Sequence, residues 1–173
     1  MPSPSDKQVG RVIRAPSLGR GWLAATRAVL EDGRKAEYDG APIVELGLLD
    51  LVVDDPSDND GLLERFGDGE RISWMHANFT DFDRVGELGG SASYATRLYD
   101  YESSGRDHLA WATEKLRSNR GSRSAVITTL QPLSDSSYIP CVSLLHFWVP
   151  DGALELIVTA HSIDFGNKRF SNN

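Results

Sequence analysis

The chain has 173 residues, of which 40% are hydrophobic and 25% charged, and its formal net charge is −7. At this length one domain can bury a core without a disulfide or a structural metal, because folding buries roughly 70% of the unfolded surface. The negative charge argues against a nucleic-acid polymer as partner, since binding its backbone requires a basic stripe. No apolar run approaches the ~20 residues that span a bilayer, and we expect no membrane association. A single cysteine and the lack of an apolar signal-peptide core at the N-terminus indicate a cytoplasmic protein.

The first third of the chain is expected to hold a tail, a helix and a bulged strand. Residues 1–16 are polar and rich in proline, which predicts a disordered tail, so that residues 17–173 form a single domain. Ser17 can cap a helix that runs to residue 32 and ends at Gly33 in the left-handed conformation. Its apolar positions follow the helical period and are Trp22, Leu23, Thr26, Val29 and Leu30.

Strand patterns begin at Pro42 and dominate the C-terminal part. Between Pro42 and Val53 the apolar residues alternate, with a change of phase that predicts a bulge near Gly47. Residues 54–70 read as a loop with one helical turn at Leu62–Phe66, and residues 72–79 fit a helix or a strand. The later elements are a helix over 107–119 and strands over 124–130, 141–149 and 154–160, the last two joined by an Asp-Gly turn at 151–152. The fold class is therefore α+β, with helices packed on a mixed or antiparallel β-sheet.

Cys141 is the strongest candidate for a reactive residue, although a lone cysteine in an apolar strand usually has only a packing role. Its place after Pro140 at the mouth of a strand favours a nucleophile instead. We expect Arg123, His161, Ser162 and Asp164 to cluster around it, and a cation close to sulfur increases the fraction of thiolate. Cys141, His161 and Asp164 could also form a hydrolase triad, but no glycine-rich elbow accompanies them. The four histidines lack the spacing of metal ligands, so no metal is expected.

Four segments of the C-terminal half resemble the thymidylate synthase and pyrimidine hydroxymethylase family. They are Ser122-Arg-Ser-Ala-Val-Ile127, Ile139-Pro-Cys-Val-Ser-Leu-Leu-His-Phe-Trp-Val149, Asp151-Gly152 and His161-Ser-Ile-Asp164. The stretch Tyr94-Ala-Thr-Arg97, with the helix that follows it, is also similar to the family. The resemblance implies a thymidylate-synthase-like fold and a homodimer in which the sheets of two subunits face each other.

The resemblance also implies a reaction and a set of roles. Cys141 would add to C6 of a pyrimidine nucleotide, whose C5 then takes a one-carbon unit from 5,10-methylenetetrahydrofolate as a methyl or hydroxymethyl group. Tyr94 would line the cavity near the reacting carbon, and Glu70 would be the general base. The binding roles fall to Arg123, His161 and Ser162 for the phosphate, with Arg123 reaching across the dimer, Asn172 for the base, and Asp164 for the folate.

Several positions depart from the family pattern. Ser124 and His161 stand where the family has arginines, which removes bidentate phosphate donors. This leaves open a second hypothesis, a non-catalytic homologue that acts as a binding or scaffold dimer. The sequence stops before the family's ribose contacts and C-terminal tail, so we expect either a fragment or a reduced homologue. It does not distinguish uracil from cytosine, ribose from deoxyribose, or a methyl from a hydroxymethyl product.

Overall fold

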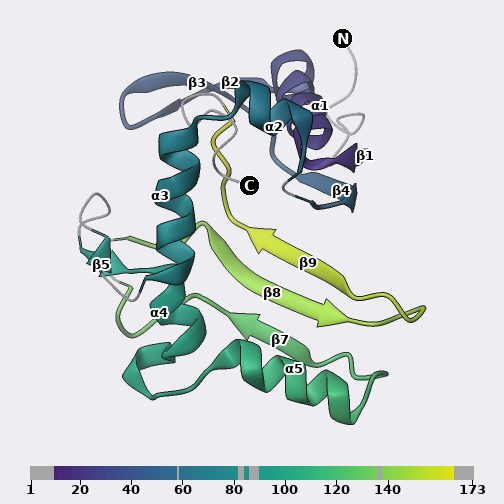
Figure 1. Cartoon of the computed structure of the whole chain (residues 1–173). Coiled ribbons are helices and arrows are strands. Elements are labelled where there is room, and N and C mark those ends of the chain that lie inside the picture. The colour runs from purple at the N-terminus through teal and green to yellow at the C-terminus, as the bar shows by residue number, and fades with distance from the viewer. Residues whose placement is uncertain (1–9, 58, 82–83, 86–89, 136–137, 166–173) are drawn as a thin grey trace. The chain divides into compact units, whose positions relative to one another are not determined.

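The computed structural model describes residues 10–57, 59–81, 84–85, 90–135 and 138–165. The chain forms two compact units, one made of residues 1–72 and 164–173 and the other of residues 73–163 (Figure 1). Helices combine with both parallel and antiparallel strand pairs, which confirms the predicted α+β class. The single domain expected over 17–173 stays a prediction.

The first unit is built on a pair of parallel strands. Its elements are β1 (Arg11–Ser17), α1 (Leu18–Asp32), β2 (Arg34–Tyr38), β3 (Ala41–Glu45), β4 (Leu49–Asp55) and α2 (Gly61–Phe66). Strand β1 pairs in parallel with β4, β2 pairs with β3 as a hairpin, and α1 packs on β1 and β4. Residues 11–16 therefore belong to a strand, although they were expected in the tail.

The helix predicted from Ser17 is confirmed, but its packing face and its end differ from expectation. The expected apolar stripe includes Leu30, which is 72% exposed, whereas Ala25 and Ala28 are buried. Small residues face the strands because they let the helix backbone approach the sheet closely. Gly33 is extended (φ −68°, ψ 152°) rather than left-handed, and glycine is needed because a Cβ there would lie 2.2 Å from the Val29 carbonyl oxygen.

The bulge expected near Gly47 is instead a break between strands. β3 ends at Glu45 and pairs with β2, while β4 begins at Leu49 and pairs with β1. The change of phase in the apolar alternation thus marks the point where the chain leaves one sheet and enters another.

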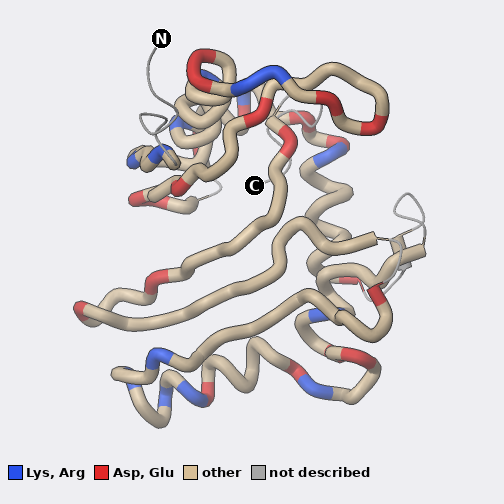
Figure 2. Tube along the Cα trace, turned by 180° about the vertical axis from the view of Figure 1, so that it is seen from behind, with Lys and Arg blue, Asp and Glu red and all other residues tan. Residues whose placement is uncertain are grey.

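The second unit carries a three-stranded antiparallel sheet backed by a helix. Its elements are α3 (Gly69–Thr80, which begins in the first unit), β5 (Arg84–Val85), β6 (Ser91–Ala92), α4 (Tyr94–Tyr99), a 3-10 turn (Tyr101–Ser103), α5 (His108–Ser118), β7 (Ala125–Thr128), β8 (Val142–Trp148) and β9 (Glu155–Ala160). The strand order is β7-β8-β9, and the buried core joins α4 and α5 to β7 through Leu98, Ala112, Ala125 and Ile127. Figure 2 shows that the middle stretches of β7, β8 and β9 carry no charged residues.

The later elements agree closely with the sequence prediction. The helix expected over 107–119 is α5, with Asp107 as its N-cap, and the ambiguous segment 72–79 lies within α3. The Asp-Gly pair lies in the connection between β8 and β9, but this connection is a longer loop over residues 149–154 rather than a tight two-residue turn, with Gly152 at a positive φ of 85°. Among the described residues no helix has both the length and the apolar character needed to cross a membrane.

Candidate active site

Cys141 lies immediately before β8 and is half-buried. Pro140, just before it, is fully buried and anchors the chain at this point. The carbonyl oxygen of Cys141 accepts a hydrogen bond at 3.1 Å from the backbone N–H of His161, which ties the cysteine to the end of β9. The pairing of β8 with β9 is irregular between Val142 and Leu144, and such bulges commonly re-aim side chains next to active sites.

Tyr94 is the first residue of α4 and is held rigidly beside the cysteine. Its ring stacks on Phe79 with centroids 4.6 Å apart, and its backbone N–H donates to the Asn78 side chain at 3.0 Å. Its hydroxyl accepts a hydrogen bond at 3.0 Å from the backbone N–H of Val142. Burial raises the pKa of Tyr94 to about 12, and the neighbouring Cys141 contributes in the same direction. The Tyr94 hydroxyl therefore stays protonated near neutral pH.

Tyr138 is a second tyrosine at the cysteine, and the sequence analysis missed it. Burial raises the pKa of Tyr138, and the neighbouring Cys141 side chain contributes in the same direction. Tyr138 lies three residues before Cys141, in a segment without strand or helix periodicity. The only signal was an aromatic residue with a polar tip close to the Pro-Cys pair.

A buried ion pair holds the chain that leads to this tyrosine. The Arg97 guanidinium donates to both carboxylate oxygens of Asp135, at 2.8 and 2.7 Å, and also to the Thr129 carbonyl at 2.9 Å. Burial raises the pKa of the Asp135 carboxyl, but hydrogen bonds from Arg97 and from the Gln131 backbone outweigh it and leave that pKa below its ordinary value. Because Arg97 is only 1% exposed and donates to several groups within the protein, we interpret it as a residue that positions the chain.

The structure brings two of the expected phosphate-binding residues to the cysteine and separates a third. His161 is joined to Cys141 through the backbone, and Ser162 follows it, both with exposed side chains. Arg123 precedes β7, whose Ala125 pairs with Phe147 at the far end of β8. The six residues from Cys141 to Phe147 span roughly 20 Å at ~3.3 Å per residue. This register corrects the expectation that Arg123 and Cys141 cluster within one chain.

Three further candidates lie outside the second unit. Glu70 is an exposed residue in the first turn of α3, and Asp164 is an exposed residue in the C-terminal segment of the first unit. Asn172 lies outside the described residues. The roles expected for these residues stay predictions. Within the described ranges no three His, Cys, Asp or Glu side chains gather as metal ligands.

Comparison with known proteins gives distant relatives of one kind. The chain is 25% identical over 162 residues to a Methanosarcina barkeri protein named "Putative thymidylate synthase", covering 92% of this chain and 73% of that protein. Proteins of the same name from Methanococcoides burtonii and Methanosarcina acetivorans are 24% and 25% identical, again over 92% of this chain. No protein-family model matches the sequence. These similarities support a thymidylate-synthase-like protein in general terms, in agreement with the resemblance found in the motifs.

Proposed function

We propose that this chain is a folate-dependent transferase that modifies C5 of a pyrimidine nucleotide, with Cys141 as the covalent nucleophile. The observation that carries the proposal is the setting of this cysteine, half-buried at a strand mouth where the Tyr94 hydroxyl accepts from the backbone N–H of the next residue. The thiolate is the attacking species in an addition of this kind. The relatives named for thymidylate synthase supply the reaction class.

In this proposal the first step is addition of the Cys141 thiolate to C6 of the pyrimidine ring. The S–C6 bond forms as the C5–C6 double bond opens, and its electron pair makes C5 nucleophilic. After C5 has taken the one-carbon unit and lost its proton, the S–C6 bond breaks and the thiolate is restored. The addition divides one difficult carbon–carbon bond formation into easier steps.

The protonated hydroxyl groups at the site have separate tasks in this scheme. Tyr94 is fixed on the Val142 backbone and forms a wall beside the sulfur. We propose that the Tyr138 hydroxyl, which stays protonated near neutral pH because its pKa is raised, contacts the Cys141 thiolate. Ser162 and His161 are exposed beside the cysteine and would bind the nucleotide phosphate, with Arg123 supplied by the second subunit of a dimer.

Binding of the folate requires a residue that accepts hydrogen bonds from its pterin ring. Asp164 fits this need, because an exposed carboxylate can accept hydrogen bonds from the N–H groups of a pterin. When bound, methylenetetrahydrofolate supplies the one-carbon unit and, for a methyl product, also the hydride. Glu70 would act as the general base in this scheme.

The test uses a mechanism-based probe, 5-fluoro-deoxyuridine monophosphate, together with methylenetetrahydrofolate. Fluorine at C5 prevents loss of the C5 substituent, so the adduct at Cys141 should accumulate and add the mass of both molecules to the intact chain. A Cys141→Ala variant should remain unmodified, and peptide mapping should place the adduct at residue 141. Absence of any adduct in the wild-type chain, with binding of the nucleotide intact, would overturn the catalytic proposal and favour the scaffold hypothesis suggested by Ser124 and His161.

The homodimer is part of the same proposal, and the open face of the β7-β8-β9 sheet supports it. The register places Val126, His146 and Ile157 in one row across the three strands, and Val126 and Ile157 are 38% and 49% exposed. His146 Nε2 is buried and has no hydrogen-bond partner within the described residues. Exposed apolar side chains in a row across a sheet are typical of a surface that a partner covers. Sedimentation should give a dimer for the wild-type chain and a monomer for Ile157→Glu, and a wild-type monomer would contradict the proposal.

A further inference from the structure

A cavity of about 430 Å³ lies between α5 and the hairpin that joins β8 to β9. Its apolar wall comes from Leu109, Ala112 and Leu116 on the helix and from Phe147, Val149 and Leu154 on the hairpin side. The volume is within the ~300–1,000 Å³ range of sites that bind small molecules. Phe147 points to the face of the sheet that α5 covers, so this cavity lies on the other face from the row of Val126, His146 and Ile157.

Small residues leave this space unfilled. Residues 109, 112, 113 and 116 form one stripe of α5, the stripe that would normally fill the gap between a helix and a sheet. Here the middle of the stripe holds Ala112 and Thr113, and the opposite wall holds Gly152, which has no side chain. Leu154 lines the cavity and is still 64% exposed. Side chains around such a gap lack contacts on one side, and a ligand of matching shape would supply them.

Two arginines give the cavity a charged rim. Arg117 and Arg120 line it next to the apolar wall, and within the part of the chain that the structure describes neither forms an ion pair. Four of the chain's 18 Lys and Arg residues fall between residues 115 and 123, in a protein with a net charge of −7. Figure 2 shows this gathering of positive charge at one end of α5 and in the turn before β7. Guanidinium groups at the edge of an apolar surface match a carboxylate attached to a hydrocarbon.

We propose that this cavity binds a small organic anion with an apolar body, in the class of medium-chain carboxylates. The hydrocarbon lies against Leu109, Leu116 and Leu154, and the carboxylate pairs with Arg117 and Arg120. The site is separate from Cys141, and the proposal does not depend on the transferase activity.

The test is a titration of the full chain with octanoate, followed through the methyl signals in ¹H–¹³C NMR spectra. Signals of Leu109, Leu116 and Leu154 should shift in a saturable way, while those of Leu62 and Leu63 in the first unit stay in place. Acetate, which lacks the hydrocarbon, and octylamine, which carries the opposite charge, should leave the lining signals unshifted. Equal binding of octylamine, or shifts spread over the whole chain, would overturn the proposal.

Matched variants separate the charged rim from the overall charge. Arg117→Gln with Arg120→Gln should weaken octanoate binding by about tenfold or more, because it removes both charge-assisted contacts. Lys115→Gln lies on the same helix outside the cavity lining, where the ammonium contacts the Trp111 ring, and should change the affinity by less than about twofold. Thr113→Phe places an aromatic ring in the cavity from an exposed helix position and should abolish saturable binding. Unchanged octanoate affinity in both the arginine and the Thr113 variants would show that the anion binds elsewhere.

Discussion

The Tyr94 hydroxyl accepts a hydrogen bond at 3.0 Å from the backbone N–H of Val142, the residue that follows Cys141. This bond links the first residue of α4 to the first residue of β8, which are 48 positions apart. Because Tyr94 is only 8% exposed, water cannot easily replace the hydroxyl. The position of the cysteine is therefore set by a side chain from a distant helix as well as by its own strand.

Replacing Tyr94 with phenylalanine should destabilise the chain by about 1–3 kcal/mol, the cost of leaving a buried backbone N–H without its acceptor. The change in the free energy of unfolding is measured by urea denaturation with tryptophan fluorescence as the signal. Tyr38→Phe is the matched control, because Tyr38 is 68% exposed, and it should leave the midpoint unchanged. Equal stability of Tyr94→Phe and wild type would show that the hydrogen bond contributes nothing.

Replacing Tyr138 with phenylalanine should slow alkylation of Cys141 by iodoacetamide at neutral pH by about tenfold. The reason is the loss of the proposed contact between the Tyr138 hydroxyl and the thiolate, since hydrogen bonds to charged groups contribute ~1.5–3 kcal/mol. The rate is measured by mass spectrometry, and a far-UV CD spectrum confirms that the variant is folded. A rate that stays the same or rises would mean that Tyr138 shields the sulfur rather than stabilising its charged form.

The Arg97–Asp135 pair should be the most costly ion pair to break among those described. Asp135→Ala leaves a guanidinium buried without its counter-ion, and the expected loss is about 3–5 kcal/mol. Asp54→Ala is the matched control, since it removes an exposed partner of Arg14 and should cost no more than about 1 kcal/mol. Thermal unfolding by CD compares the two variants, and similar losses would contradict the positioning role given to Arg97.

The elements that the sequence predicted well are those whose signals are local. The N-cap of α5 at Asp107 can be recognised from the few residues around it. The same is true of the alternating pattern of β8 and β9 and of the Asp-Gly pair between them. Strand β1 was missed because the prolines at positions 2, 4 and 16 made residues 1–16 resemble a tail, and because its partner β4 lies more than 30 residues away. Parallel pairing at that separation leaves no local pattern to read.

At the candidate site, too, residues with a local sequence signal were predicted and residues that depend on long-range contacts were not. The Pro140-Cys141 pair and Tyr94 stand in recognisable motifs, and the structure places them together. Arg97 and Asp135 are 38 positions apart, and nothing in either neighbourhood signals a buried ion pair. Arg123 was misplaced because the motif gives its residue type, whereas only the strand register gives its distance from the cysteine.

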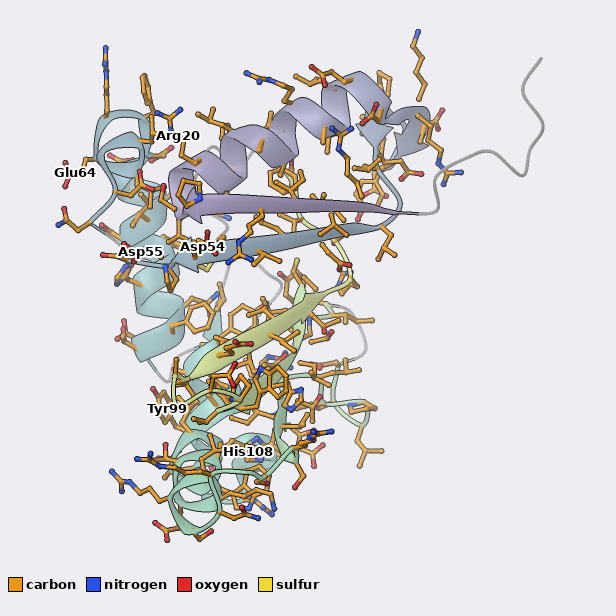
Figure 3. All side chains as sticks on the ribbon, turned by 90° about the vertical axis from the view of Figure 1, so that its right-hand side faces the viewer. Arg20, Asp54, Asp55, Glu64, Tyr99 and His108 are labelled. Atoms are coloured by element: carbon orange, nitrogen blue, oxygen red, sulfur yellow. The ribbon has the colours of Figure 1, made fainter. Side chains whose placement is uncertain are left out.

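Asp60 should make the first unit sensitive to acid. Its carboxylate accepts from the backbone N–H groups of Gly19 and Leu62, both at 2.8 Å, and so caps the starts of α1 and α2 together. Figure 3 shows the two helix starts side by side, with Arg20 on one and Glu64 on the other. A hydrogen bond from the Ser17 side chain, followed by those from the Gly19 and Leu62 backbone, lowers the pKa of Asp60 from 3.8 to about 2.

A carboxyl group with a lowered pKa in the folded state adds stability above its unfolded pKa, and the addition is lost as the pH falls through the folded value. Asp60→Asn keeps an oxygen acceptor but not the charge. The difference in unfolding free energy between wild type and this variant should therefore be constant above about pH 4 and shrink toward pH 2. Asp50→Asn, at an exposed position, should show no such convergence. Because both variants remove one carboxylate, a convergence seen equally in both would mean that overall charge, and not the shared cap, controls the acid response.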